Sequence, residues 1–194
     1  SMPIWIAAYG PKALQMAGKV GDGLVIQLAD PGLCAWFSEQ AIAAGKAAGR
    51  DMSNYRVLAC APVWVGDRVR GIEQTKWFPA LVGNHVADIV EKYGAANDLV
   101  PDSLTTYIER RRGVGAGGEG YDYRQHGEVE SDNTYYISDE ITDSFCIVGE
   151  ATDHVARLAQ LQEAGVTQFT IYLTGGEEER HVAEYAKNVI PHFS

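Results

Sequence analysis

The first thirty residues hold the pattern that most constrains the fold. Two apolar runs of strand length, 4–8 and 24–28, flank a stretch of helix length that begins at Gly10-Pro11. Runs of this length are typical of buried parallel strands. Pro11 suits the first helical position, where no backbone N–H is needed, and Gly10 permits a sharp turn before it. The sequence therefore predicts a buried strand, a short helix and a second strand parallel to the first.

The turn at Gly10 also predicts an anion site. Amides at the start of a helix carry partial positive charge and attract anions. We therefore expect the backbone amides of Ala8, Tyr9 and Gly10, together with Lys12, to bind a phosphate. The alternative is a tight turn that packing alone fixes.

Residues 7–23 carry a longer pattern, A-A-x-G-P-x-x-x-x-x-A-G-x-x-G-D-G. It resembles the luciferase-like monooxygenase superfamily of TIM barrels, and within it the F420-dependent oxidoreductases, such as methylenetetrahydromethanopterin reductase-like proteins. The resemblance extends to 100–107, 120–123, 126–127, 139–149, 164–169 and 190–191. It implies that 4–8 is the fifth barrel strand, that the following turn holds the phosphate of F420, or of FMN as the alternative, and that Tyr9 flanks the cofactor.

The resemblance and the length together predict a partial barrel. A whole (β/α)8 barrel needs about 250 residues, whereas this chain has 194, and family members place a comparable stretch before the matched pattern. We expect an α/β fold that is the C-terminal half of a TIM barrel, as one partial domain over 1–194. Its parts are the first βα units at 3–94, an insertion or lid at 95–143 and the final βα units at 144–194. Ser1-Met2 resembles a remnant of tag removal, so the truncation is a designed boundary or a natural short reading frame.

Further helices and strands are expected to alternate along the chain. They are a helix from Pro31 to Gly49, a strand at 55–65, helical sequence at 67–93, a core segment at 145–148, a helix at 152–164, a strand at 168–173 and a last helix closed by Pro191. Pro62 predicts a bulge or a strand end, and Pro79 predicts a helix break. Helical spacing places Val182, Tyr185, Ala186, Val189 and Ile190 together on the last helix.

Composition limits the partners. A net charge of −10 would repel nucleic acid and acidic membranes, which leaves small molecules and proteins as expected ligands. No apolar run approaches the roughly 18 residues of a membrane span. Cys34, Cys60 and Cys146 lack metal-ligand spacing, and we expect reduced thiols and a cytoplasmic protein. His85, His126, His154 and His181 are expected at the surface, and no metal site is predicted.

Substrate contacts are predicted at Gln27 and Asp30. These residues follow a strand at its carboxyl end, where TIM-barrel sites lie. Relatives that act on sugar phosphates carry basic and hydroxyl side chains at this place, so the resemblance argues against a phosphorylated substrate. Asp30 is better suited to capping the helix that begins at Pro31. No catalytic residue can be named from the sequence.

Arg110, Arg111 and Arg112 precede a glycine-rich stretch at 113–118 that matches G-x-G-x-x-G by letter. The strand–turn–helix context of a dinucleotide site is missing, because a helical stretch comes before the glycines. The arginines either complement the end of that helix or bind the acidic tail of F420 on a lid. The later pair Gly175-Gly176 is rejected as the main anion site, because glutamates crowd the helix that follows.

Two classes of function remain from the sequence. The first is a luciferase-like F420-dependent oxidoreductase that transfers hydride between the deazaflavin and an organic substrate, with an FMN-dependent monooxygenase as its variant. The second is a non-catalytic half-barrel that serves as a binding or assembly module. A half-barrel has unpaired strand edges, so we also expect a homodimer or larger homo-oligomer.

Overall fold

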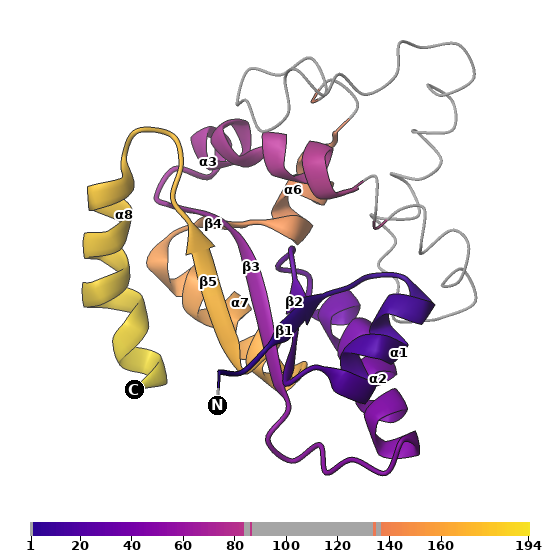
Figure 1. Cartoon of the computed structure of the whole chain (residues 1–194). Helices are drawn as coiled ribbons and strands as arrows, with labels where there is room; N and C mark the ends of the chain where they lie inside the picture. Colours follow the sequence, from indigo (N-terminus) through magenta and orange to yellow (C-terminus); the bar gives the residue numbers. More distant parts are fainter. Residues whose placement is uncertain (1, 84–85, 87–133, 135–136) are drawn as a thin grey trace, which may run out of the picture.

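The computed structural model describes residues 2–83, 86, 134 and 137–194, and within them a parallel α/β fold (Figure 1). The sheet consists of β1 (Trp5–Ala7), β2 (Gly23–Ile26), β3 (Arg56–Val65), β4 (Ile147–Gly149) and β5 (Gln168–Tyr172). Strands β1, β2 and β3 pair in that order, and β3 also pairs with β4 and β5. All four pairings are parallel, which agrees with the predicted βα alternation.

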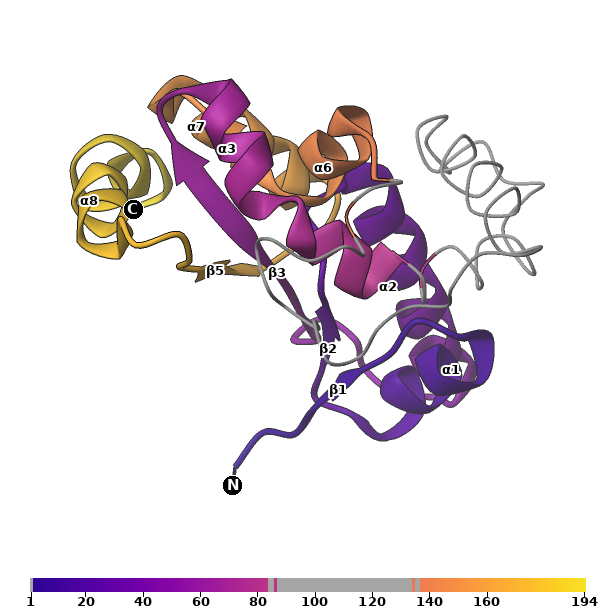
Figure 2. The same ribbon diagram turned by 90° about the horizontal axis from the view of Figure 1, so that it is seen from above.

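Helices lie along one side of the curved sheet (Figure 2). They are α1 (Pro11–Val20), α2 (Pro31–Ala47), α3 (Arg68–Thr75), α6 (Asp139–Phe145), α7 (Ala151–Glu163) and α8 (Glu178–Glu184). A π-helical turn (Tyr185–Val189) and a 3-10 turn (Ile190–Phe193) continue α8. Helix α6 begins inside the range predicted as an insertion, and its Ile141 is fully buried in the core. The insertion itself stays a prediction, because most of it lies outside the described residues.

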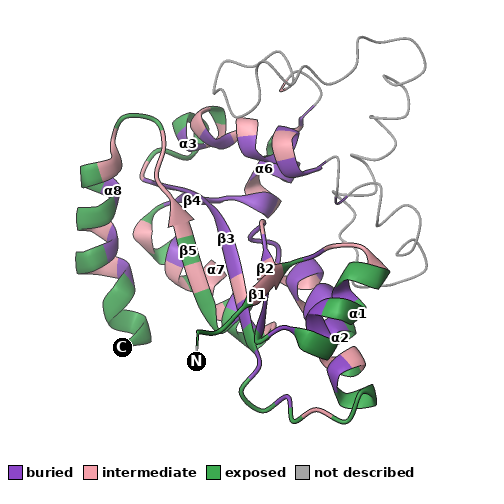
Figure 3. Ribbon diagram, in the orientation of Figure 1, coloured by how far each residue is buried: buried purple, intermediate pink, exposed green. Residues whose placement is uncertain are grey.

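Burial differs across the sheet: most of β3 is buried, whereas β5 is half-buried or exposed (Figure 3). On the face toward the helices, which we call the closed face, Leu24, Ile26 and Ala59 have no exposed surface. On the opposite face, which we call the open face, Val25 and Leu58 are half-buried neighbours in register. Side chains alternate along a strand, so one sequence run supplies both faces.

Small residues let α1 and α2 pack with their backbones in close contact. A Cβ atom placed on Gly18 would lie 1.9 Å from the carbonyl oxygen of Ala41, so any side chain there would separate the helices. Leu14 and Ala17 on the same helix are buried. Glycine is therefore required at position 18. The close contact with α2 holds α1 in place after the turn that follows β1.

The structure corrects three local predictions. Strand β1 is not buried on both faces: Ile4 just before it is 61% exposed, because β1 is an edge strand that pairs only with β2 in the described part of the chain. Pro62 neither ends nor bulges β3; it lies between the residues that pair with β2 and those that pair with β4. The helix break falls at Lys76, and Pro79 lies in the first turn of the next helical segment, where a missing N–H is tolerated.

The prediction of a surface position was also wrong for two of the four histidines. His154 and His181 are fully buried, whereas His85 and His126 lie outside the described residues. His154 Nε2 donates to the Trp64 carbonyl (3.1 Å), and its Nδ1 accepts from the Tyr185 hydroxyl (2.9 Å). The π-helical turn also shifts the buried face of the last helix to His181, Tyr185 and Val189. Val182, predicted on that face, is instead 47% exposed.

Candidate active site

Polar side chains from four strands meet on the open face. Tyr9 follows β1, Gln27 follows β2, Cys60 lies in the middle of β3 and Tyr172 ends β5. We call these four residues the mouth cluster. The Gln27 amide N–H donates to the Tyr9 hydroxyl (2.7 Å), and Gln27 Nε2 donates to the Tyr172 hydroxyl (3.2 Å). The cluster therefore ties the carboxyl ends of β1, β2 and β5 together, although they are far apart in sequence.

Donor counting gives the hydrogen bonds of the cluster a direction. The Cys60 thiol donates its single hydrogen to the Ile26 carbonyl (3.5 Å). Its contact with the Tyr172 hydroxyl (3.2 Å) must then be donated by Tyr172. The chain runs from Gln27 through Tyr172 and Cys60 to Ile26, and such chains polarise their members cooperatively. The Gln27 side-chain oxygen is not used in it and can accept a hydrogen bond from a ligand.

The titratable members of the mouth cluster are neutral. Burial raises the pKa of Tyr9 well above its usual value, and burial also raises the pKa values of Tyr172 and Cys60. At physiological pH the two phenols and the thiol all keep their protons. They can orient a ligand by hydrogen bonding, but they are poor general bases, and Cys60 is a poor nucleophile.

The turn from β1 into α1 differs from the starts of the other five described helices, α2, α3, α6, α7 and α8. Asp30, Asp67 and Ser138 cap α2, α3 and α6 with side-chain oxygens, and α7 and α8 have acidic residues in their first turns. Helix α1 has no side-chain cap at Gly10 and no acidic residue in its first turn. Its first amides are therefore not engaged by a local carboxylate or hydroxyl, which is what an external anion requires.

The predicted site residues fall into three groups. Ala8, Tyr9, Gly10, Lys12 and Gln27 lie at the adjoining ends of β1 and β2, with Lys12 exposed. Asp30 is buried and caps α2. One carboxylate oxygen accepts a hydrogen bond from the Leu33 amide (2.8 Å), and the other accepts one from the Ser144 hydroxyl (2.6 Å). This geometry favours the capping role. Arg110, Arg111 and Arg112 lie outside the described residues, so their role stays a prediction.

Cys60 and Tyr172 were missed as site residues in the sequence. The alternation along 168–173 predicted a strand, but it did not indicate which face would be open. Among the described residues, no group of three or more His, Cys, Asp or Glu side chains could hold a metal ion. Within the same residues, no helix has both the length and the apolar character needed to cross a bilayer.

A family model described as luciferase-like monooxygenase matches residues 1–168, which is most of the chain. The chain belongs to this family. The 5,10-methylenetetrahydromethanopterin reductase of Archaeoglobus fulgidus is 27% identical over 194 residues, covering 98% of this chain and 54% of that protein. The chain thus spans about half the length of the curated relatives it matches.

Solved structures support the same fold. The coenzyme F420-dependent tetrahydromethanopterin reductase of Methanopyrus kandleri superposes with a TM-score of 0.68 at 21% identity, covering 100% of this chain and 51% of that one. An F420-dependent secondary alcohol dehydrogenase, solved with an F420–acetone adduct, gives a TM-score of 0.66 at 14% identity, with 100% and 49% covered. The described residues therefore form part of a TIM-type barrel, and the open face is the side that would face the barrel interior.

Proposed function

We propose that this chain supplies the phosphate-binding half of the active site of an F420-dependent oxidoreductase, which transfers hydride between the deazaflavin and an organic substrate. The observation that carries the proposal is the mouth cluster, where Tyr9, Gln27 and Tyr172 converge at the carboxyl ends of parallel strands. Sites of TIM-type barrels lie at this end of the strands. Family membership supports a redox cofactor.

The residues present fit such a cofactor. The uncapped start of α1, with Gly10 at the N-cap and Lys12 exposed in the first turn, suits a phosphate. Reduced F420, when bound, supplies the hydride. The chain's own residues bind and orient: the Tyr9 hydroxyl fixes the end of β2 beside the turn, and neutral Tyr172 holds the Gln27 amide. No carboxylate belongs to the mouth cluster, so the site does not repel an electron-rich cofactor.

Gln27 is the residue proposed to contact substrate. Its backbone N–H and its Nε2 are both held by tyrosine hydroxyls, so the side chain is oriented before a ligand arrives. Its side-chain oxygen, which has no hydrogen-bond partner among the described residues, would accept a hydrogen bond from a substrate hydroxyl or amide. With Asp30 committed to Leu33 and Ser144, an uncharged organic substrate fits this edge better than a phosphorylated one.

Titration of the purified chain with F420 and with FMN, followed by fluorescence, tests the proposal. We expect micromolar F420 binding, and we expect Tyr9→Phe to weaken it by roughly tenfold, about the contribution of one hydrogen bond. Tyr55→Phe is the matched control, because the Tyr55 hydroxyl is buried without a hydrogen-bond partner among the described residues. Tighter binding of FMN than of F420 would favour the monooxygenase alternative. No detectable binding of either cofactor would favour a non-catalytic module.

We also propose that a second copy completes the barrel in a homodimer. In the part of the chain that the structure describes, β1 pairs only with β2, and β5 pairs only with β3. Joining β1 of each copy to β5 of the other would continue the parallel order and cover both open faces. Sedimentation velocity should show a dimer. Val25→Lys, on the open face, should dissociate it, whereas Val69→Lys, at an exposed position of α3, should not. A monomer at all concentrations would refute the homodimer.

A further inference from the structure

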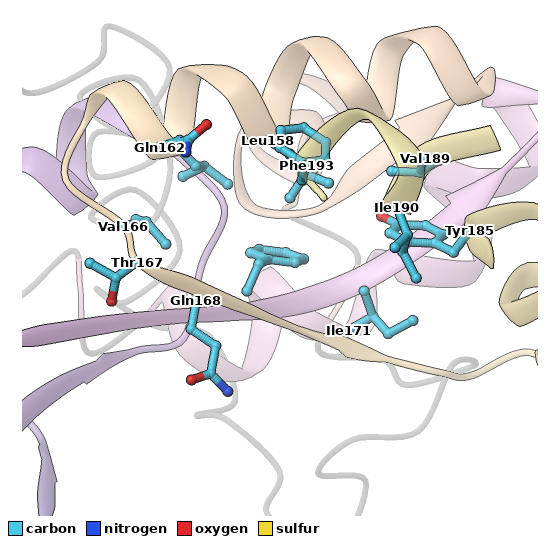
Figure 4. Close-up of a pocket in the computed structure, with 12 residues that line it drawn as sticks. Leu158, Gln162, Val166, Thr167, Gln168, Ile171, Tyr185, Val189, Ile190 and Phe193 are labelled. Atoms are coloured by element: carbon cyan, nitrogen blue, oxygen red, sulfur yellow. The ribbon is translucent and has the colours of Figure 1, made fainter. Parts of the chain in front are cut away.

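An apolar groove lies on the closed side of β5, away from the mouth cluster. It has a volume of about 440 Å³ and is walled by α7, β5 and the π-helical and 3-10 turns at the end of the chain (Figure 4). Its main apolar walls are Leu158, Phe169, Ile171, Val189, Ile190 and Phe193. This volume lies within the range of small-molecule pockets, roughly 300–1,000 Å³.

The irregular end of the chain shapes the groove. After α8 the backbone passes through a π-helical turn and then a 3-10 turn, and π-helical turns are frequent at functional sites. Tyr185 and Val189 form a buried base, whereas Ile190 is 55% exposed and Phe193 41% exposed at the rim. The Tyr185 hydroxyl is already hydrogen-bonded to His154, so the floor of the groove has no polar group that needs a ligand as its partner.

The polarity of the groove indicates the class of ligand. Gln162 and Thr167 lie at one end of the groove, the side chain of Gln168 points to the opposite side of β5, and apolar side chains such as Ile190 line the rest (Figure 4). None of the described residues that line the groove carries a charge. A charged ligand would lose hydration without a compensating partner, whereas an uncharged amphipathic one would match both ends.

We propose that this groove binds a small uncharged amphipathic molecule, with a hydrocarbon chain or ring between β5 and the terminal turns and one hydroxyl, carbonyl or amide at the end where Gln162 lies. The site is separate from the proposed active site, because Ile171 and Tyr172 are adjacent residues that face opposite sides of β5. It does not depend on the proposed oxidoreductase activity.

The test uses Nile red as an uncharged fluorescent probe and n-octanol as its competitor. We expect Nile red to bind the chain and n-octanol to displace it. Ile190→Glu should weaken Nile red binding by roughly tenfold, because a carboxylate at the rim must be desolvated when the probe binds. Since Ile190 is more than half exposed, the variant should fold, which circular dichroism checks.

Val182→Glu is the matched control. Val182 lies on α8, which the two terminal turns continue, and its exposure is similar at 47%, but it does not line the groove. Equal Nile red affinities of the two variants would overturn the proposal, since the probe would then occupy another surface such as the open face. Failure of the unmodified chain to bind Nile red would also overturn it. So would a shift to smaller species in sedimentation on Ile190→Glu alone, because a second copy would then fill the groove.

Discussion

The closed and open faces of the sheet are built from the same strands, yet they serve different purposes. On the closed face, Ile26 and Ala59 are fully buried against helices, while their neighbours Val25 and Leu58 are half-buried on the open face. The closed face carries aliphatic packing and buried histidines, and the open face carries the hydrogen-bonded mouth cluster. The difference indicates that tight packing is concentrated on the closed face, while the proposed active site lies on the open face.

Truncation of one residue on each face gives the largest expected contrast. Ile26→Ala should lower the free energy of unfolding by about 3 kcal/mol, because a fully buried side chain leaves a cavity. Val25→Ala, one residue earlier but half-buried, should lower it by less than about 1 kcal/mol. Urea denaturation measures both. Equal losses would mean that the open face is as tightly covered as the closed one.

Acid should destabilise the closed side selectively. Burial lowers the pKa of His154 to about 4 and also lowers the pKa of His181. An unfolded histidine takes up its proton near pH 6.5, so the stability that neutral His154 contributes is complete above that pH and is lost as pH falls toward 4. From about pH 8 to about pH 5 the free energy of unfolding should fall by about 2 kcal/mol through His154.

His154→Gln isolates that contribution. The variant should show a flatter dependence of unfolding free energy on pH across the same window, with the smaller contribution of His181 remaining. The mouth cluster should not respond, since burial raises the pKa values of Tyr9 and Cys60 rather than lowering them. An unchanged slope in His154→Gln would show that other groups cause the acid sensitivity.

The hydrogen-bond chain of the mouth cluster should contribute little to stability. Cys60→Ala removes one thiol bond to the Ile26 carbonyl and should cost about 1 kcal/mol in the free energy of unfolding. Half-buried Tyr172 can then donate to water. F420 affinity should fall clearly even though the loss of stability is small, because Tyr172 and Gln27 lose their fixed orientation. A large stability loss with unchanged F420 affinity would make the cluster structural.

The smallest expected difference between the two faces is in the rate at which their cysteine thiols react with a labelling reagent. Burial raises the pKa values of all three cysteines, so each should react slowly with a disulfide reagent near pH 8. Cys60, 3% exposed on the open face, should react before Cys34 and Cys146, which have no exposed surface. Mass spectrometry of partly labelled chain gives the order. Earlier labelling of Cys34 would contradict the assignment of faces.

Local sequence signals predicted much of the fold. Asp30 was predicted as a helix cap and Pro11 as the first residue of a helix, and the structure confirms both. Each signal depends on residues within a turn or two, which is why sequence reasoning reached them. Family resemblance in 7–23 supplied the barrel and the F420 expectation, and the family match confirms the former.

Long-range contacts could not be predicted in the same way. His154 has a polar side chain, and only its contacts with Trp64 and Tyr185, from two other elements, explain why it is buried. Cys60 and Tyr172 are separated by 112 residues, and nothing near either one indicates that they touch. The candidate site was therefore predicted where it follows β1 and β2 and missed where it depends on β3 and β5.

Strand β3 pairs with β2, β4 and β5, and this has a consequence for the order of folding during synthesis. Its partner segment at Thr167 comes 110 residues after Val57. At roughly 5–20 residues per second, the ribosome needs about 5–20 s to supply that partner. During this interval one edge of the longest described strand stays unpaired, which makes nascent β3 a natural substrate for a chaperone.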